Sequence, residues 1–463
     1  MMREDKIIVY PFKEVIVLDY QAVQETNEHA QAEIKGRIPF DKKNEYIAMG
    51  RKDEWVKVVT VTEGNENIIF YGIMYEMRLE VVGGTCIIYL CLKSGTSLMD
   101  YNEKIRSFQD SSLTYSNLLD TCNQGYDDSA KIMTVGKGEA IGRFIMQYKE
   151  TDWSFIKRLA SLNHTIVVAD CYTKGEKYHF GIPVRKGESV EELDEYRMIC
   201  DAREYQNKKK HGLNIRKEDT ISYVWVSRDS YKIGEQWTIE GRRLIIWKIE
   251  TCRKGAELYH TYYMKPEAGF QSIAYNNNYL CGVALFGKVK KVKDEKVQVE
   301  ILDDQNKDRS GARWFSFASP YSSPDGTGWY CMPEPGDKIR LYFPTQKEED
   351  AYVSSSYHEE GSSLRTHPEC KFWRNKEGKE IQLFTDHILI TNNDGTFIEL
   401  SDTKGIEIVS AGSVRIRAEG LLDISSKSSS IEMSAYKKVA LKQGDTEINL
   451  AGDLNMQGAK VML

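Results

Sequence analysis

The chain has 463 residues, which at roughly 100 to 200 residues per domain predicts about three domains and more than one hydrophobic core. Pro is scarce at 10 residues and Gly is ordinary at 34, which excludes collagen-like and proline-rich architectures. The 63 Lys and Arg residues stand against 69 Asp and Glu residues, and this net charge of −6 argues against the whole chain binding nucleic acid by charge.

The nine cysteines are scattered and none forms a C-x-x-C pair, so we expect free thiols made in a reducing compartment. Charged residues interrupt every apolar run of the opening MMREDKIIVYPFKEVIVLDYQ, and no later run approaches the 18 or so apolar residues of a membrane span. We therefore predict neither a signal peptide nor a membrane anchor.

Residues 1–96 contain short β-rich runs, such as IIVY, VIVLDY and WVKVVTV, between Gly, Asn and charged residues. Runs of this length and spacing predict a first small β-barrel domain. Residues 219–280 repeat the pattern with ISYVWVS, RRLIIWKIE and ELYHTYYMK, and predict a second one.

The segment between these two, residues 97–218, has a different pattern. The stretches SSLTYSNLLDTCNQ and TDWSFIKRLASLN begin with Ser, Thr or Asp N-cap candidates and continue with apolar residues at helical spacing. The runs IGRFIMQY, HTIVVADCY and KYHFGI predict strands between and after the helices. We interpret the segment as an α+β insertion rather than a repeated βαβ array.

Residues 281–358 predict five strands, in VALFGKVKKV, KVQVEIL, RWFSFAS, KIRLYF and AYVSSSY. Five strands in a segment this short suit a Greek-key barrel of the OB type. Barrels of this type often bind oligonucleotides, but residues 281–357 hold 8 Lys and 3 Arg against 7 Asp and 5 Glu. Such binding needs a basic groove, so we expect no nucleic-acid partner.

After a predicted linker over residues 359–374, the segment 375–463 has apolar pairs that recur every eight residues, with two later slips of register. The positions are Ile390, Ile398, Leu400, Ile406, Ile408, Val414, Ile416, Leu422, Ile424, Ile431, Met433, Val439, Leu441, Ile448 and Leu450. Short strands with one apolar face need a partner for that face. Three copies wound about a common axis would supply it, and an ordinary antiparallel meander is the alternative.

Several of these segments together resemble one family. The block WFSFASPYSSPDGTGWYCMPEPGDKIRLYFPTQKEEDAYVSSSY resembles the OB barrel of VgrG proteins and of the central spikes of contractile phage tails and R-type bacteriocins. The following RNKEGKEIQLFTDHILITNNDG resembles the entry into their trimeric β-helix. Upstream, RSFQDSSLTYSNLLDTC and QYKETDWSFIKRLASLN resemble the hub, and the resemblance covers essentially the whole chain.

The resemblance implies a mainly β protein with an α+β insertion: a hub of two small β-barrels, an OB collar and a trimeric, intertwined β-helix needle. In that family three subunits form a hub that joins the six-fold tube to a three-fold envelope-piercing spike. The expected partners are two further copies of the chain, tube and baseplate proteins, and the target envelope. We expect synthesis in the bacterial cytoplasm and action in an extracellular or virion-like contractile particle.

Two groups of residues are assigned on this basis. The aromatic residues Trp314, Phe317, Trp329 and Tyr330 are expected in the barrel core and in collar contacts between subunits. Three copies of the terminal Val461, Met462 and Leu463 would form an apolar end that seats a PAAR-like tip cap.

Catalytic motifs of the types H-E-x-x-H, G-x-S-x-G and G-x-x-x-x-G-K-[ST] do not occur. The charged runs EELDEY, KEED and KKKHG are interpreted as solvated surface. The last histidine is His387, so a histidine-bound metal at the tip is not expected. We predict a protein that is not an enzyme and has no cofactor, with a trimeric receptor-binding fibre and a peptidoglycan-degrading spike as alternatives.

Overall fold

The computed structural model describes residues 6–50, 54–62, 64–185, 195–239, 241–358 and 360–450. They form two compact units that divide after residue 358, where the linker is predicted to begin. Strands make up most of the regular structure, and the described α-helices are short. The predicted fold class, mainly β with an α+β insertion, is confirmed.

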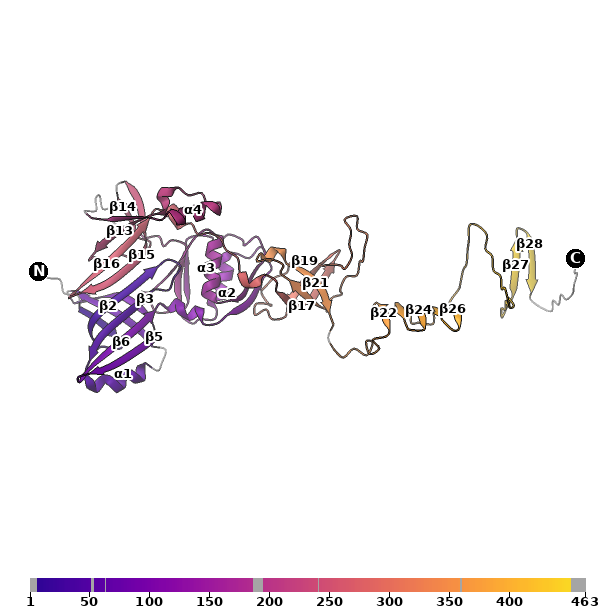
Figure 1. Ribbon diagram of the computed structural model, residues 1–463, viewed down its shortest axis with the longest axis horizontal. Coiled ribbons are helices and arrows are strands. Elements are labelled where there is room, and N and C mark those ends of the chain that lie inside the picture. Colours follow the sequence, from indigo (N-terminus) through magenta and orange to yellow (C-terminus); the bar gives the residue numbers. More distant parts are fainter. Residues whose placement is uncertain are drawn as a thin grey trace. The chain divides into compact units, whose positions relative to one another are not determined.

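The first unit contains a large antiparallel sheet, which includes both regions predicted as hub barrels (Figure 1). In the described part of the chain the sheet has 11 strands in the order β1-β4-β5-β6-β3-β2-β15-β16-β13-β12, and β14 pairs with β15 outside this path. The strands are β1 (Lys6–Tyr10), β2 (Ile16–Glu25), β3 (Gln31–Ile38), β4 (Trp55–Thr62), β5 (Asn65–Val82), β6 (Thr85–Lys93), β12 (Arg197–Cys200), β13 (Ile221–Ser227), β14 (Gln236–Ile239), β15 (Arg242–Lys254) and β16 (Glu257–Lys265).

Strands β2 and β15 pair directly, although they lie far apart in the chain. Their register runs from Glu25 opposite Lys248 to Gln21 opposite Cys252. The two predicted barrel regions are therefore halves of one continuous sheet. Strand β12 belongs to the second half, although it precedes residue 219, where the second barrel region is predicted to begin. Each half keeps its own hydrophobic core, around Val9, Phe12 and Phe70 in the first and around Trp237, Tyr262 and Met264 in the second.

The α+β insertion lies between these halves in the chain. Helix α2 (Tyr115–Asn123) follows a capping box in which the Thr114 hydroxyl accepts from the Asn117 N–H at 3.3 Å. Helix α3 (Asp152–Leu162) follows Thr151, whose hydroxyl accepts from the Ser154 N–H at 3.1 Å. Both helices and their Thr caps are as predicted. The strands of the insertion are β7 (Lys104–Phe108), β8 (Ala130–Met133), β9 (Ile145–Glu150), β10 (Val167–Ala169) and β11 (Lys177–Phe180).

Strand β9 is buried on both faces. Ile145 packs with Trp153 in the core of the insertion, whereas Phe144, Met146 and Tyr148 pack into the core of the domain that follows. Successive side chains of a strand point to opposite faces of its sheet. One short strand therefore contributes to two cores and joins them.

The following domain is a five-stranded sheet in the order β19-β18-β17-β20-β21. A parallel bridge between Phe317 and Val353 connects its two edges, and the Ala318 N–H donates to the Val353 carbonyl at 2.8 Å. The sheet thereby closes into the partly open barrel that an OB-type fold has. Its strands coincide with the five predicted ones and are β17 (Ala284–Lys293), β18 (Lys296–Ile301), β19 (Trp314–Ser316), β20 (Lys338–Tyr342) and β21 (Tyr352–Tyr357).

The second unit holds a five-stranded antiparallel sheet in sequential order and a separate hairpin. Within the described residues 360–450, the segment 410–438 contains no strand, although the eight-residue period predicts strands there. The strands of the unit are β22 (Lys371–Arg374), β23 (Glu380–Leu383), β24 (His387–Thr391), β25 (Phe397–Ser401), β26 (Gly405–Val409), β27 (Val439–Gln443) and β28 (Thr446–Leu450).

Short helices complete the described structure. They are α1 (Lys43–Met49), α4 (Ala202–Lys210), and the 3-10 helices η1 (Phe40–Lys42), η2 (Gly95–Asp100), η3 (Lys217–Thr220), η4 (Glu267–Phe270), η5 (Asn278–Leu280) and η6 (Glu348–Asp350). Among the described residues no helix has both the length and the apolar character needed to cross a membrane.

In two of the charged runs one residue is buried and does not fit the interpretation as solvated surface, whereas the other residues of both runs are exposed. Lys208, from KKKHG, lies in helix α4 and is 8% exposed. Its Nζ donates to the Gly269 carbonyl and to Glu204, both at 2.6 Å. Glu348, from KEED, is 6% exposed and bonds to a buried arginine. In EELDEY, residues 191–194 lie outside the described residues.

The barrel core provides a test with two adjacent residues. Phe315 is 1% exposed and packs against Phe144 with ring centroids 5.4 Å apart, whereas Trp314 is 36% exposed. We expect Phe315→Ala to lower the free energy of unfolding of the barrel by about 3 to 5 kcal/mol, because it leaves a cavity in a closed core. Trp314→Ala should have a much smaller effect. Hydrogen exchange of the barrel amides measures both, and equal losses would contradict this assignment of the core.

Candidate assembly interface

The strands of the second unit align apolar side chains into two rows across one sheet face. In the register of β23 to β26, directly opposed residues fall on the same face, as do residues two apart along a strand. The first row consists of Ile381, Ile390, Ile398 and Ile408. The second row consists of Leu383, Ile388, Leu400 and Ile406. These eight residues are called the apolar rows below.

The apolar rows have no cover within the described part of the second unit. Each of their side chains is between 38% and 71% exposed, the extremes being Ile398 and Ile406. Apolar surface of this extent marks an interaction site on a soluble protein. A single-layer sheet also lacks the second layer that would give it a core. The rows are therefore the strongest candidate surface for assembly.

Turns with left-handed backbone keep the rows in register. Gly395 and Gly405 have φ of 71° and 84°, a conformation in which an L side chain would be strained. These turns let successive strands reverse, so that apolar residues two apart on each strand line up across the sheet.

The structure brings together five predicted needle residues in these rows and adds three that the sequence analysis missed. The five are Ile390, Ile398, Leu400, Ile406 and Ile408, and the three are Ile381, Leu383 and Ile388. The missed residues carry the same signal of two apolar residues separated by one position. They fall outside the strict eight-residue count because the step from Ile381 to Ile388 is seven residues and the step from Ile388 to Ile398 is ten.

The single chain does not bring the other predicted needle residues together on one surface. Val414, Ile416, Leu422, Ile424, Ile431 and Met433 are 49% to 66% exposed and lie in the segment without strands. In the hairpin of β27 and β28, Val439 stands opposite Leu450 and Leu441 opposite Ile448. The proposed cap residues Val461, Met462 and Leu463 lie outside the described residues.

The predicted collar residues separate into two environments. Phe317 is half-buried against the barrel core, whereas Trp329 and Tyr330 are 57% and 69% exposed in the loop after β19. These two residues are therefore not in the barrel core of the single chain, because hydrogen bonds within the loop and to the turn between β17 and β18 hold the loop outward. The Ser319 hydroxyl donates to the Trp329 carbonyl at 2.6 Å, and the Tyr330 hydroxyl donates to the Asp294 carbonyl at 3.1 Å.

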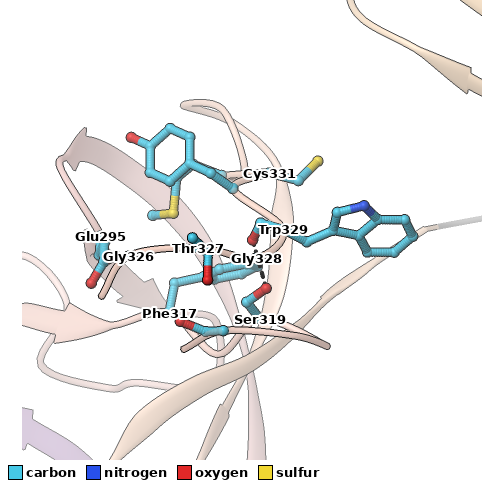
Figure 2. A pocket seen from close by; sticks show the side chains of 11 residues that line it. Glu295, Phe317, Ser319, Gly326, Thr327, Gly328, Trp329 and Cys331 are labelled. Carbon is cyan, nitrogen blue, oxygen red and sulfur yellow. Dashed lines mark hydrogen bonds between the residues drawn. The ribbon is translucent and has the colours of Figure 1, made fainter. Parts of the chain in front are cut away.

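Figure 2 shows the small pocket beneath this loop, with the indole of Trp329 directed away from it. Its lining includes Glu295, Phe317 and Thr327. The lining contains a single carboxylate and no histidine. Trp and Tyr often anchor protein interfaces, so the two exposed aromatic side chains make the loop a candidate contact surface.

One group of side chains has the connectivity of a hydrolytic triad. His29 lies 2.8 Å from the Thr96 hydroxyl through Nδ1 and 2.8 Å from the Asp100 carboxylate through Nε2. Thr96 is fully buried and its hydroxyl also lies 2.9 Å from that of Ser94. A substrate could not reach this hydroxyl, so we interpret the group as a structural connection. No group of three or more metal-binding side chains is found in the described ranges.

Comparison with known proteins finds similarity in structure only. No protein-family model matches the chain, and no curated protein matches it by sequence.

Several solved structures share its fold. The c3393 protein of E. coli, described as a component of the type VI secretion system with structural similarity to the bacteriophage T4 tail proteins gp27 and gp5, aligns with a TM-score of 0.54 at 12% identity. That alignment covers 76% of this chain and 100% of c3393.

Structures of the Francisella PdpA–VgrG complex align over 88% of this chain. The half-lidded form has a TM-score of 0.58 at 10% identity and is covered over 88% of its chain. The lidless form has a TM-score of 0.55 at 9% identity and is covered over 98%. The chain therefore shares the fold of the c3393 protein and of the PdpA–VgrG structures.

Proposed function

We propose that the chain is the structural hub and envelope-piercing spike of a contractile injection particle, and that it works as a homotrimer. The observation that carries this proposal is the pair of uncovered apolar rows on a chain with a tail-hub fold. Three copies around a common axis would each turn their rows inward and so bury them. The same packing would give the segment 410–438 neighbouring strands from the other copies.

The physical requirements of a spike support this reading. A needle must resist compression, and a closed prism of three chains leaves few unpaired strand edges. A trimer can also connect a six-fold tube to a single point, because each subunit then presents two similar units to the tube. The two halves of the 11-stranded sheet are candidates for those units, since each has its own core.

We further propose that the barrel forms a collar in which the loop with Trp329 and Tyr330 contacts a neighbouring subunit or a baseplate protein. The two exposed side chains favour contact with protein, and the composition of the barrel disfavours nucleic acid. We propose no catalytic role, because the hydroxyl of Thr96 is buried and none of the three catalytic motifs named above occurs in the sequence.

The mass of the purified protein tests the trimer. We expect light scattering to give about three times the chain mass of 53.2 kDa. A mass near that of one chain would contradict the proposal. A receptor-binding fibre would also be trimeric but would bind target cells in isolated form, whereas a hub should bind tube protein instead. Clearing of a peptidoglycan gel would favour the enzyme alternative.

A charge placed in the apolar rows tests the needle directly. Ile398→Asp would bury three carboxylates at the trimer axis, at a cost on the order of several kcal/mol each. We expect the second unit to become sensitive to protease. Ser401→Asp is the matched control, because it adds the same charge on the opposite face of the same strand and should leave the unit resistant. Equal behaviour of the two variants would argue against burial of the rows.

The proposed seat of the tip cap can be tested by deletion. Removal of Val461, Met462 and Leu463 takes away the apolar end that we propose as the seat. We expect a PAAR-like cap protein to stop co-purifying with the shortened chain, while the mass of the trimer is unchanged. Retention of the cap would show that it binds elsewhere.

A further inference from the structure

Arg158 forms a buried ionic contact between the α+β insertion and the barrel. It lies on helix α3, and its side chain is 1% exposed. Its Nε and Nη2 donate to the two carboxylate oxygens of Glu150, at the end of strand β9, both at 2.8 Å. Its Nη1 donates at 2.8 Å to Glu348, which belongs to helix η6 of the barrel. Nη2 also donates to the Met146 carbonyl at 2.8 Å.

The barrel thus supplies one carboxylate to a guanidinium that the insertion holds in a fixed orientation. The pair with Glu150 is bidentate, which fixes the plane of the guanidinium and therefore the direction of Nη1. Only one placement of the barrel puts the Glu348 carboxylate where Nη1 can donate to it. The side chain of Glu348 is 7% exposed, so water does not replace the bond easily.

The apolar contact beside this group does not fix an orientation by itself. Phe144, Met146 and Tyr148 pack into the barrel core, but hydrophobic contact is non-directional. Buried ion pairs add little net stability compared with apolar packing, yet an unpaired member is costly. The apolar contact can therefore hold the barrel near the insertion, while the ionic contact selects one orientation.

A second polar contact crosses the same joint from strand β7. The Asp304 carboxylate of the barrel accepts from the Ser107 N–H at 2.9 Å and from the Ser107 hydroxyl at 2.6 Å. Backbone bonds run beside it, from Gln305 N–H to the Ile105 carbonyl at 2.9 Å and from Gln109 N–H to the Ser310 carbonyl at 2.6 Å. These two amides are protected only while the barrel is docked.

We propose that the Glu150–Arg158–Glu348 triad is a latch that locks the folded barrel onto the insertion in one orientation, so that the first unit moves as one rigid body. The latch rests on contacts within the first unit and does not depend on the proposed function. Without Glu348, Nη1 of Arg158 loses its charged partner in the docked state, and the barrel separates more often as a folded domain.

Hydrogen exchange in the full-length protein tests the latch. Loss of a buried, charge-assisted hydrogen bond should raise the population of the undocked barrel by about 10- to 100-fold. In Glu348→Leu the Gln305 and Gln109 amides should exchange faster by that factor, while amides of the central barrel strands β17 and β20 exchange as in the wild type. Glu348→Gln, which keeps one acceptor oxygen, should give a smaller increase.

Glu349→Leu is the matched control, because Glu349 is the exposed neighbour of Glu348 on the same short helix. It should leave both joint amides protected. Arg158→Met tests the latch from the other side of the joint and should expose the same two amides. The proposal is overturned if Glu348→Leu leaves the joint amides protected, or if Glu349→Leu exposes them equally. It is also overturned if the barrel strands lose protection to the same extent in Glu348→Leu, because that would mean a general loss of barrel stability.

Discussion

Apolar faces of β-sheets must be covered, and the two units of this chain meet that constraint differently. The first unit covers its sheets with its own helices and loops and builds four hydrophobic clusters from the described residues. The second unit arranges its apolar residues into two straight rows and leaves them exposed. The covered unit is suited to be a platform. The exposed rows of the second unit are the observation from which we propose a trimeric spike.

Within the first unit, parts that are distant in the chain depend on a few shared elements. The β2 and β15 pairing joins the two sheet halves edge to edge, and strand β9 places alternate side chains in two cores. Arg158, the Asp304–Ser107 contact and the backbone hydrogen bonds beside it then add direction to a joint that apolar packing alone would not orient. The insertion and the barrel are therefore held together by apolar packing and oriented by polar contacts.

The sequence predicts local features well because their causes are local. The Thr114 and Thr151 caps act on amides three residues away, and the five barrel strands are marked by their own apolar alternation and turns. The recurring apolar pairs of the second unit can also be read from the sequence. In the structure, those in strands β24 to β26 lie in cross-strand rows. The missed row members, such as Ile388, carry the same local pattern but depend on loop lengths that a strict period does not allow.

The sequence by itself determined that the chain is mainly β, where its capped helices begin, and that its last segment has an apolar face without a core. Tertiary structure alone decided that the two β regions share one sheet, because the pairing of β2 with β15 depends on segments that meet only after folding. It also decided that Lys208 and Glu348 are buried. A charged side chain is solvated or buried according to the partner opposite it, and that partner comes from elsewhere in the chain.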